Sequence, residues 1–299
     1  MLNRILYLTI AALLLVLQTA ACADKVWLEP TRPTAAQSDW YPQAIQTHTG
    51  EIIALDAKQL AMRMAGDEKE SLFAAYRVIW IEPSEVGEKQ AAAIKLFDEK
   101  KYDMALRGLL DALSERPPVW RQQWLSMVAA QAAWRSSRGA IALELVSQLD
   151  RRPLPPIALA WLPIAWRNPR GISSAATTDA ALKRLGDPSS AVRLVAASWL
   201  LSSDRREAAV ETLKTLSADH SRPVIARLAE TVLWRATSPP EVAAAAARWQ
   251  ERLDALPIVL QVGPTVAMVE LLNNANQDEV AERLKLSLEL TPPHPHPDL

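Results

Sequence analysis

The chain has 299 residues, of which 49 % are hydrophobic, so it can bury a sizeable core and is not expected to be disordered. Its 33 lysines and arginines nearly balance its 34 aspartates and glutamates. A molecule without a net field is not drawn to nucleic-acid phosphates or to an anionic membrane surface, so we predict no nucleic-acid partner.

Residues 1–23 have the layout of a secretory signal peptide. Arg4 precedes an apolar run from Ile5 to Leu17, and small residues follow that run. The run is shorter than the roughly 20 residues that a membrane-spanning helix needs. We therefore predict an exported protein that is located outside the cytoplasm, in the periplasm or at the cell envelope.

The end of this segment permits two cleavage patterns. Ala21, Cys22 and Ala23 fit the small-x-small pattern of ordinary signal peptidase, whereas Thr19 to Cys22 resembles a bacterial lipobox in which the cysteine is lipidated. Thr19 stands where lipoboxes usually have leucine. Both outcomes stay open, a freely secreted protein or membrane attachment through a lipid on Cys22. Because Cys22 is the only cysteine, the body must be stabilised without a disulfide.

The segment after the signal peptide changes character at about residue 40. Residues 24–39 mix proline, threonine, serine and charge without periodicity, which predicts a tether. Residues 40–83 contain apolar stretches of strand length at 51–55, 59–64 and 71–82, separated by turn residues. This pattern resembles the small, strongly bent antiparallel units of SH3-like or Sm-like barrels.

Residues 84–150 have a helical pattern with the chain's most specific motif. The motif places small, large, aromatic and terminating residues at fixed spacings: Ala93, Leu96, Tyr102, Ala105, Leu109, Ala112 and Pro117. Alanines that face each other let two antiparallel helices approach closely. The stretch resembles tetratricopeptide (TPR) repeats. Five prolines in the following segment, 151–173, forbid a long straight helix and predict a packed crossover.

A second kind of repeat is predicted over residues 174–260. Two stretches match closely in residue kind and spacing: Leu185, Asp187, Val192, Ala197 and Leu201 against Leu216, Asp219, Val224, Ala229 and Leu233. We expect Asp187 to cap the first helix and Pro188 to begin it. The unit resembles HEAT-like repeats. Ser238 and Glu241 form a capping-box pattern, and residues 261–299 give a partial terminal TPR-like repeat followed by a Pro/His tail.

These patterns predict a mainly α fold, an α-solenoid of TPR-like and HEAT-like helix pairs preceded by a small antiparallel β domain. The chain resembles exported bacterial helical-repeat proteins. Such repeat families generally act as scaffolds, so the resemblance implies a protein or peptide partner that binds in an extended groove.

The sequence offers no constellation for chemistry. It has no phosphate-binding glycine loop, no helix with paired zinc ligands and no nucleophile elbow, and its four histidines are scattered. We therefore predict no catalytic residue, no metal site, no cofactor and no enzymatic activity.

Several tryptophans stand next to arginines, and these pairs are the candidate partner-binding residues. We single out Arg121, Trp134 and Arg135 on the helices, with Arg77 and Trp80 in the β unit. Charge and stacking would bind an anionic segment or a glycan. The alternative is structural, with each tryptophan in the core and its arginine on the flank of the helix.

Three functions follow in order of preference. The first is a non-enzymatic extracytoplasmic scaffold for protein–protein interaction. The second is an envelope structural protein that binds cell-surface polymer or glycan through the β unit and the Trp/Arg pairs. The third is an enzyme with an unrecognised site.

Overall fold

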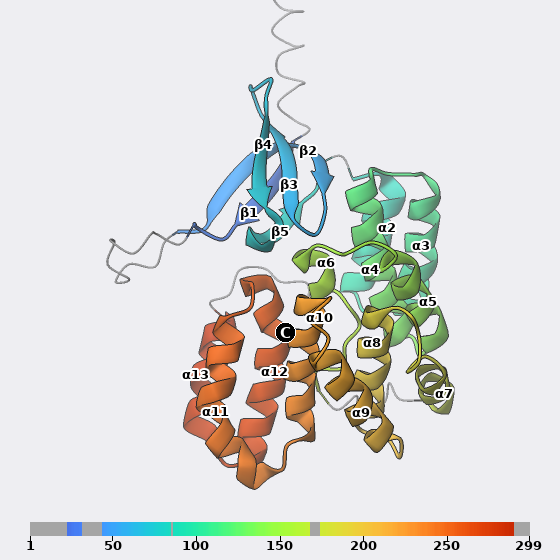
Figure 1. Cartoon of the computed structure of the whole chain (residues 1–299). Coiled ribbons are helices and arrows are strands. Elements are labelled where there is room, and N and C mark those ends of the chain that lie inside the picture. The colour runs from blue at the N-terminus through green and yellow to red at the C-terminus, as the bar shows by residue number, and fades with distance from the viewer. Residues whose placement is uncertain (1–22, 32–43, 85, 168–173, 290–299) are drawn as a thin grey trace, which may run out of the picture.

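The computed structural model describes residues 23–31, 44–84, 86–167 and 174–289. The described chain is mainly helical, with a small antiparallel sheet near its N-terminus (Figure 1). The predicted signal peptide up to Cys22 and the Pro/His tail from residue 290 lie outside the described residues. In the part of the chain that is described, no helix combines the length and the hydrophobicity needed to cross a bilayer.

The sheet has five strands in the order β4-β3-β2-β1-β5. The strands are β1 (Asp24–Leu28), β2 (Gln46–Leu55), β3 (Gln59–Met64), β4 (Glu70–Ala74) and β5 (Val78–Glu82), with a 3₁₀ turn, η1 (Ala75–Arg77), before the last strand. β1 pairs antiparallel with both β2 and β5, so the first strand lies inside the sheet and Val26 faces His48 on one side and Ile81 on the other.

The position of β1 corrects the predicted tether over 24–39. Its first five residues form a strand whose burial alternates, with Val26 and Leu28 fully buried. The strand predicted at 59–64 is confirmed as β3. The single stretch expected at 71–82 is two strands separated by η1, because the chain turns there from one edge of the sheet to the other.

The helices follow the sheet in chain order, and most of them pack against the next helix, whereas α6 packs against α12, β5 and α4 (Figure 1). They are α2 (Glu88–Asp98), α3 (Tyr102–Ser114), α4 (Val119–Arg135), α5 (Gly139–Leu149), α6 (Pro156–Ala160), α7 (Ala175–Lys183), α8 (Ser190–Leu200), α9 (Arg206–Ser217), α10 (Pro223–Leu233), α11 (Pro239–Asp254), α12 (Ile258–Asn274) and α13 (Asp278–Glu289), with a 3₁₀ turn, η2 (Trp234–Ala236), after α10.

Small residues bring α2 and α3 together, as the pattern over 93–117 predicts. Ala93, Ala105 and Ala112 are buried. A Cβ built on Gly108 would lie 3.0 Å from the Cβ of Ala93. The two helices can approach this closely because neither carries a larger side chain at the crossing.

The start of α8 differs from the prediction in two respects. Pro188 does not begin the helix, because α8 starts at Ser190 and Pro188 precedes its N-cap. Asp187 does not cap the helix, because its Oδ1 accepts a 2.9 Å hydrogen bond from the backbone N–H of Ser189 and its Oδ2 binds Arg184. Ser189 is the N-cap, and its hydroxyl accepts the N–H of Val192 at 3.1 Å. The same Asp-x-Ser turn recurs before α10, where Asp219 accepts the N–H of Ser221.

The helices do not form a simple open row. α12 begins before the boundary predicted at residue 260 and packs against α6 and β5 as well as against α10, α11 and α13. α12 also comes very close to the segment after α6 at Gly263, where a Cβ would lie 2.2 Å from Nε1 of Trp166. In Figure 1, α6 lies below the sheet between the α2–α5 group and the helices of the C-terminal part.

Candidate functional site

A groove of about 510 Å³, lined largely by apolar and aromatic side chains, lies where the chain leaves the sheet and enters the helices. We call it the junction groove. One side comes from β5 and the segment after it, the other from α2, and the remaining wall from α4 and the residue that follows α6. A smaller apolar recess shares Ile81, Pro83 and Trp124 with the groove and extends it toward α6.

Aromatic side chains from four separate elements form the wall of the junction groove. They are Trp80 on β5, Phe97 on α2, Trp124 on α4 and Trp161 after α6. The ring centroids of Trp124 and Trp161 are 6.2 Å apart at 82°, and those of Phe97 and Trp161 are 6.1 Å apart. Ring contacts of this kind favour defined orientations of Phe97, Trp124 and Trp161.

Polar groups of the junction groove lack partners within the described chain. The Nε2 of Gln90 and the Nε1 of Trp161 are buried donors without an acceptor in the described structure, and the two side chains belong to residues only 5 % and 6 % exposed. Asp98 ends α2 at the rim, and burial raises the pKa of its carboxyl. Glu82 and Lys95 complete the rim.

A buried charged cluster fixes the groove's position between sheet and helices. Asp24 Oδ2 accepts the N–H of Ile52 at 3.1 Å, and its Oδ1 accepts the N–H and the hydroxyl of Ser84 at 2.7 and 3.0 Å. Arg121 Nη2 donates to the carbonyl of Ser84 at 2.7 Å and lies 3.5 Å from Asp24 Oδ1. This arrangement joins β1, β2, the exit from β5 and α4.

The structure brings only one of the five candidate partner-binding residues, Trp80, into the junction groove. Arg121 is 9 % exposed, and its guanidinium belongs to the buried charged cluster around Asp24. Arg77 donates to the carbonyl of Glu29 at 2.7 Å and to Oε1 of Gln46 at 2.8 Å, so it ties the start of β2 to the end of β1.

The remaining pair, Trp134 and Arg135, lies away from the groove. The ring of Trp134 is buried and stacks on Trp199, with centroids 5.8 Å apart and planes 2° apart. The guanidinium of Arg135 lies over Trp134 at 5.2 Å. For Trp134 and Arg135 the structural alternative describes the observed positions, whereas Arg121 is buried rather than on the flank of its helix.

Sequence reasoning missed Phe97, Trp124, Trp161 and the polar groups beside them. The search for tryptophans next to arginines passed over Trp124 and Trp161, whose neighbours are not arginines. The prolines around Trp161 did indicate a packed, broken segment, which was the available signal.

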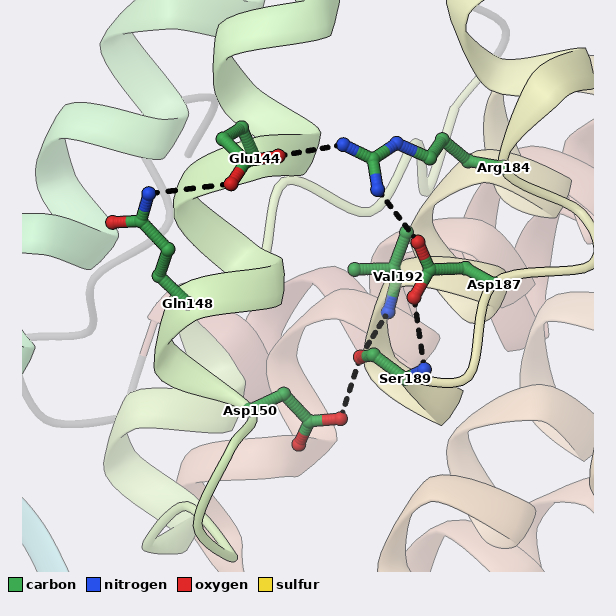
Figure 2. A network of polar contacts seen from close by, with 7 residues as sticks. All are labelled: Glu144, Gln148, Asp150, Arg184, Asp187, Ser189 and Val192. Atoms are coloured by element: carbon green, nitrogen blue, oxygen red, sulfur yellow. Dashed lines mark hydrogen bonds and ion pairs between the residues drawn. The ribbon is translucent and has the colours of Figure 1, made fainter.

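A second polar network lies among the helices, and its groups are satisfied within the chain (Figure 2). Figure 2 shows Arg184 between two carboxylates, with 2.6 Å to Glu144 and 2.7 Å to Asp187. These hydrogen bonds raise the pKa of Arg184, with Asp187 the larger cause, and they lower the pKa of Glu144. The network connects α5 to the turn before α8.

Asp150 extends the network to the next turn. Its Oδ2 accepts the hydroxyl of Ser189 at 2.6 Å (Figure 2), and its Oδ1 accepts from Arg222 Nη2 at 2.6 Å. One buried carboxylate at the end of α5 therefore links the turns before α8 and α10. We assign this network to stability, because each carboxylate in it already has its donors.

Within the described ranges, no three histidine, cysteine or acidic side chains are grouped as a metal ion would require. Comparison of the chain with protein-family models, with curated proteins and with solved structures gives no match.

Proposed function

We propose that the protein is a non-enzymatic extracytoplasmic scaffold that binds a segment of a partner protein in the junction groove. The observation that carries the proposal is the wall of four aromatic side chains from four segments of the chain, three of which, Phe97, Trp124 and Trp161, are in ring contact with one another. At protein interfaces a few buried residues, aromatic ones prominent among them, carry most of the binding energy.

A glycan of the cell envelope is the second candidate, because Trp80 comes from the β unit and offers an indole ring at the same groove. Both candidates would compete for one surface. The aliphatic side chains of Ile94 and Val128 in the wall favour apolar peptide side chains over the hydroxyl groups of a sugar.

We also infer the finer architecture behind this function. The order β4-β3-β2-β1-β5 and the 3₁₀ turn before the last strand support an SH3-like barrel. The close contact of Gly108 with Ala93 supports a TPR-like pair, and the repeated Asp-x-Ser turn supports HEAT-like pairs. The apolar N-terminal run supports export, with or without a lipid on Cys22.

The test uses two variants on neighbouring residues of α2. Ala91 lines the junction groove, whereas Ala92 is equally exposed and does not. The full chain is expressed, extracted from the envelope in mild detergent and used for affinity capture with quantitative mass spectrometry. We expect one protein at near-equal amount with the wild type and with Ala92→Trp, and its loss with Ala91→Trp.

Two outcomes would contradict the proposal. Equal capture by Ala91→Trp and Ala92→Trp would show that the groove is not the binding surface. Co-sedimentation with purified envelope polysaccharide that Ala91→Trp abolishes, without an enriched protein, would favour the glycan. The intact mass of the extracted protein separately reports whether Cys22 carries a diacylglycerol.

A further inference from the structure

The rim of the junction groove carries a carboxylate without a cation. Asp98 makes no ion pair with any described residue, and it is the last residue of α2, where the helix dipole already presents its negative end. Its pKa is raised by burial. A carboxylate in this position favours a positive charge that arrives from outside.

Lys95 on α2 also lines the groove, but it forms no ion pair with Asp98 in the described structure. Lys101, and less strongly Lys95, lower the pKa of Glu99. Lys25 stands opposite Glu82 in the strand register, but its ammonium lies over the ring of Trp27 at 4.5 Å. The rim therefore holds two carboxylates, Glu82 and Asp98, against the single ammonium of Lys95, and it keeps a net negative charge.

The wall of the groove adds two donors that need acceptors. Gln90 Nε2 and Trp161 Nε1 are buried at the groove without a partner among the described residues. Buried donors without acceptors are rare in folded proteins, and an incoming group that accepts from them gains affinity. Main-chain carbonyls of an extended peptide are acceptors at regular spacing, with apolar side chains between them.

We propose that the occupant of the junction groove is an extended peptide in which a lysine or arginine adjoins apolar residues, with its basic side chain bound at Asp98. Its apolar side chains pack on Trp80, Trp124 and Phe97, and its carbonyls accept from the buried donors as the wall adjusts. This inference rests on the proposed function and names the chemistry of the partner. A neutral glycan supplies no cation for the rim.

The probe is a random linear 12-residue peptide library displayed on phage and selected on the full chain, followed by fluorescence anisotropy with the selected peptides. Asp98→Asn is compared with Asp111→Asn, an equally exposed aspartate on α3 outside the groove. Ala91→Trp and Ala92→Trp report whether the groove is occupied.

We expect the selected peptides to be enriched in lysine or arginine beside apolar residues. Asp98→Asn should weaken binding about tenfold, as loss of one charge-assisted hydrogen bond does. Replacing the peptide's basic residue with glutamine should weaken binding similarly and make it insensitive to Asp98→Asn. Asp111→Asn and Ala92→Trp should bind as the wild type does.

The other outcomes would contradict either this inference or the proposed function, as follows. If Ala91→Trp abolishes binding but the peptides lack basic residues, or Asp98→Asn and Asp111→Asn bind equally, this inference fails and the proposed function stands. If the peptides bind Ala91→Trp and Ala92→Trp equally, the groove is not their site and the inference fails. If no peptide is enriched, the peptide class is wrong, and capture of a folded partner still decides the proposed function.

Discussion

Replacing Arg121 with methionine should lower the free energy of unfolding by about 3 kcal/mol. Arg121 is 9 % exposed and supplies a 2.7 Å hydrogen bond to the carbonyl of Ser84 beside the buried Asp24. Breaking a buried charge pair from one side costs about 3 to 5 kcal/mol, because the other charge stays buried. We expect a loss at the lower end of this range, since Asp24 keeps three hydrogen-bond donors, the N–H of Ile52 and the N–H and hydroxyl of Ser84.

A double-mutant cycle tests this reasoning. Arg121→Met, Asp24→Asn and the double variant are unfolded in urea, with circular dichroism and tryptophan fluorescence as independent probes. The double variant should lose less unfolding free energy than the sum of the losses of the two single variants, because removing both partners leaves no buried charge. Arg283→Met, on an exposed position of α13, is the control and should stay within about 0.5 kcal/mol of the wild type. A loss below about 1 kcal/mol for Arg121→Met, or strict additivity, would refute the argument.

Three further predictions concern packing, the polar network and pH. Gly263→Ala should lose stability by about 1 to 3 kcal/mol in thermal unfolding because its Cβ would overlap Trp166, whereas Gly186→Ala, which meets no atom, should be neutral or gain up to about 1 kcal/mol. Asp150→Ala should lower the free energy of unfolding by about 3 kcal/mol in the same assay, since it removes the acceptor of three donors, and a loss as small as that of a surface residue would contradict the assigned role. Because burial raises the pKa of Asp98, the folded state binds its proton more tightly, so the stability that this group contributes is largest below the ordinary pKa of 3.8 and falls as the pH rises through the folded pKa. Relative to the wild type, Asp98→Asn should therefore gain unfolding free energy in urea titrations as the pH is raised from about 3 to 7. A difference in unfolding free energy that does not change with pH would contradict this sign.

Features that depend on neighbouring residues could be predicted from the sequence. The apolar face of α8, from Val192 to Leu200, is buried as its spacing indicates. The capping box of Ser238 and Glu241 is present, with both side chains in reciprocal contact. Helix periodicity and caps involve residues within one or two turns, so a single sequence contains all the information they need.

Features that depend on residues far apart in the chain could not be predicted from the sequence. Asp24–Leu28 was predicted as part of a tether because it belongs to a stretch that mixes proline, threonine, serine and charge without periodicity, and only its pairing with β2 and β5 makes it a strand. The junction groove likewise gathers side chains from four elements, of which only Trp80 was singled out. Arg121 was expected on an exposed flank, but the exit from the sheet covers that flank and makes the arginine part of the core.

The contact of α12 with β5 and α6 has a consequence for how the chain can be divided. In modular repeat proteins a terminal unit can be removed and its neighbour exposes only one more face. Here the main hydrophobic core is shared by residues as far apart as Val26 and Ala267, and α12 is part of it. Removing the helices from α12 onward would therefore uncover β5 and α6 near the opposite end of the chain. Because α12 covers β5 and α6, a protein shortened before α12 should lose the stability of the N-terminal part as well.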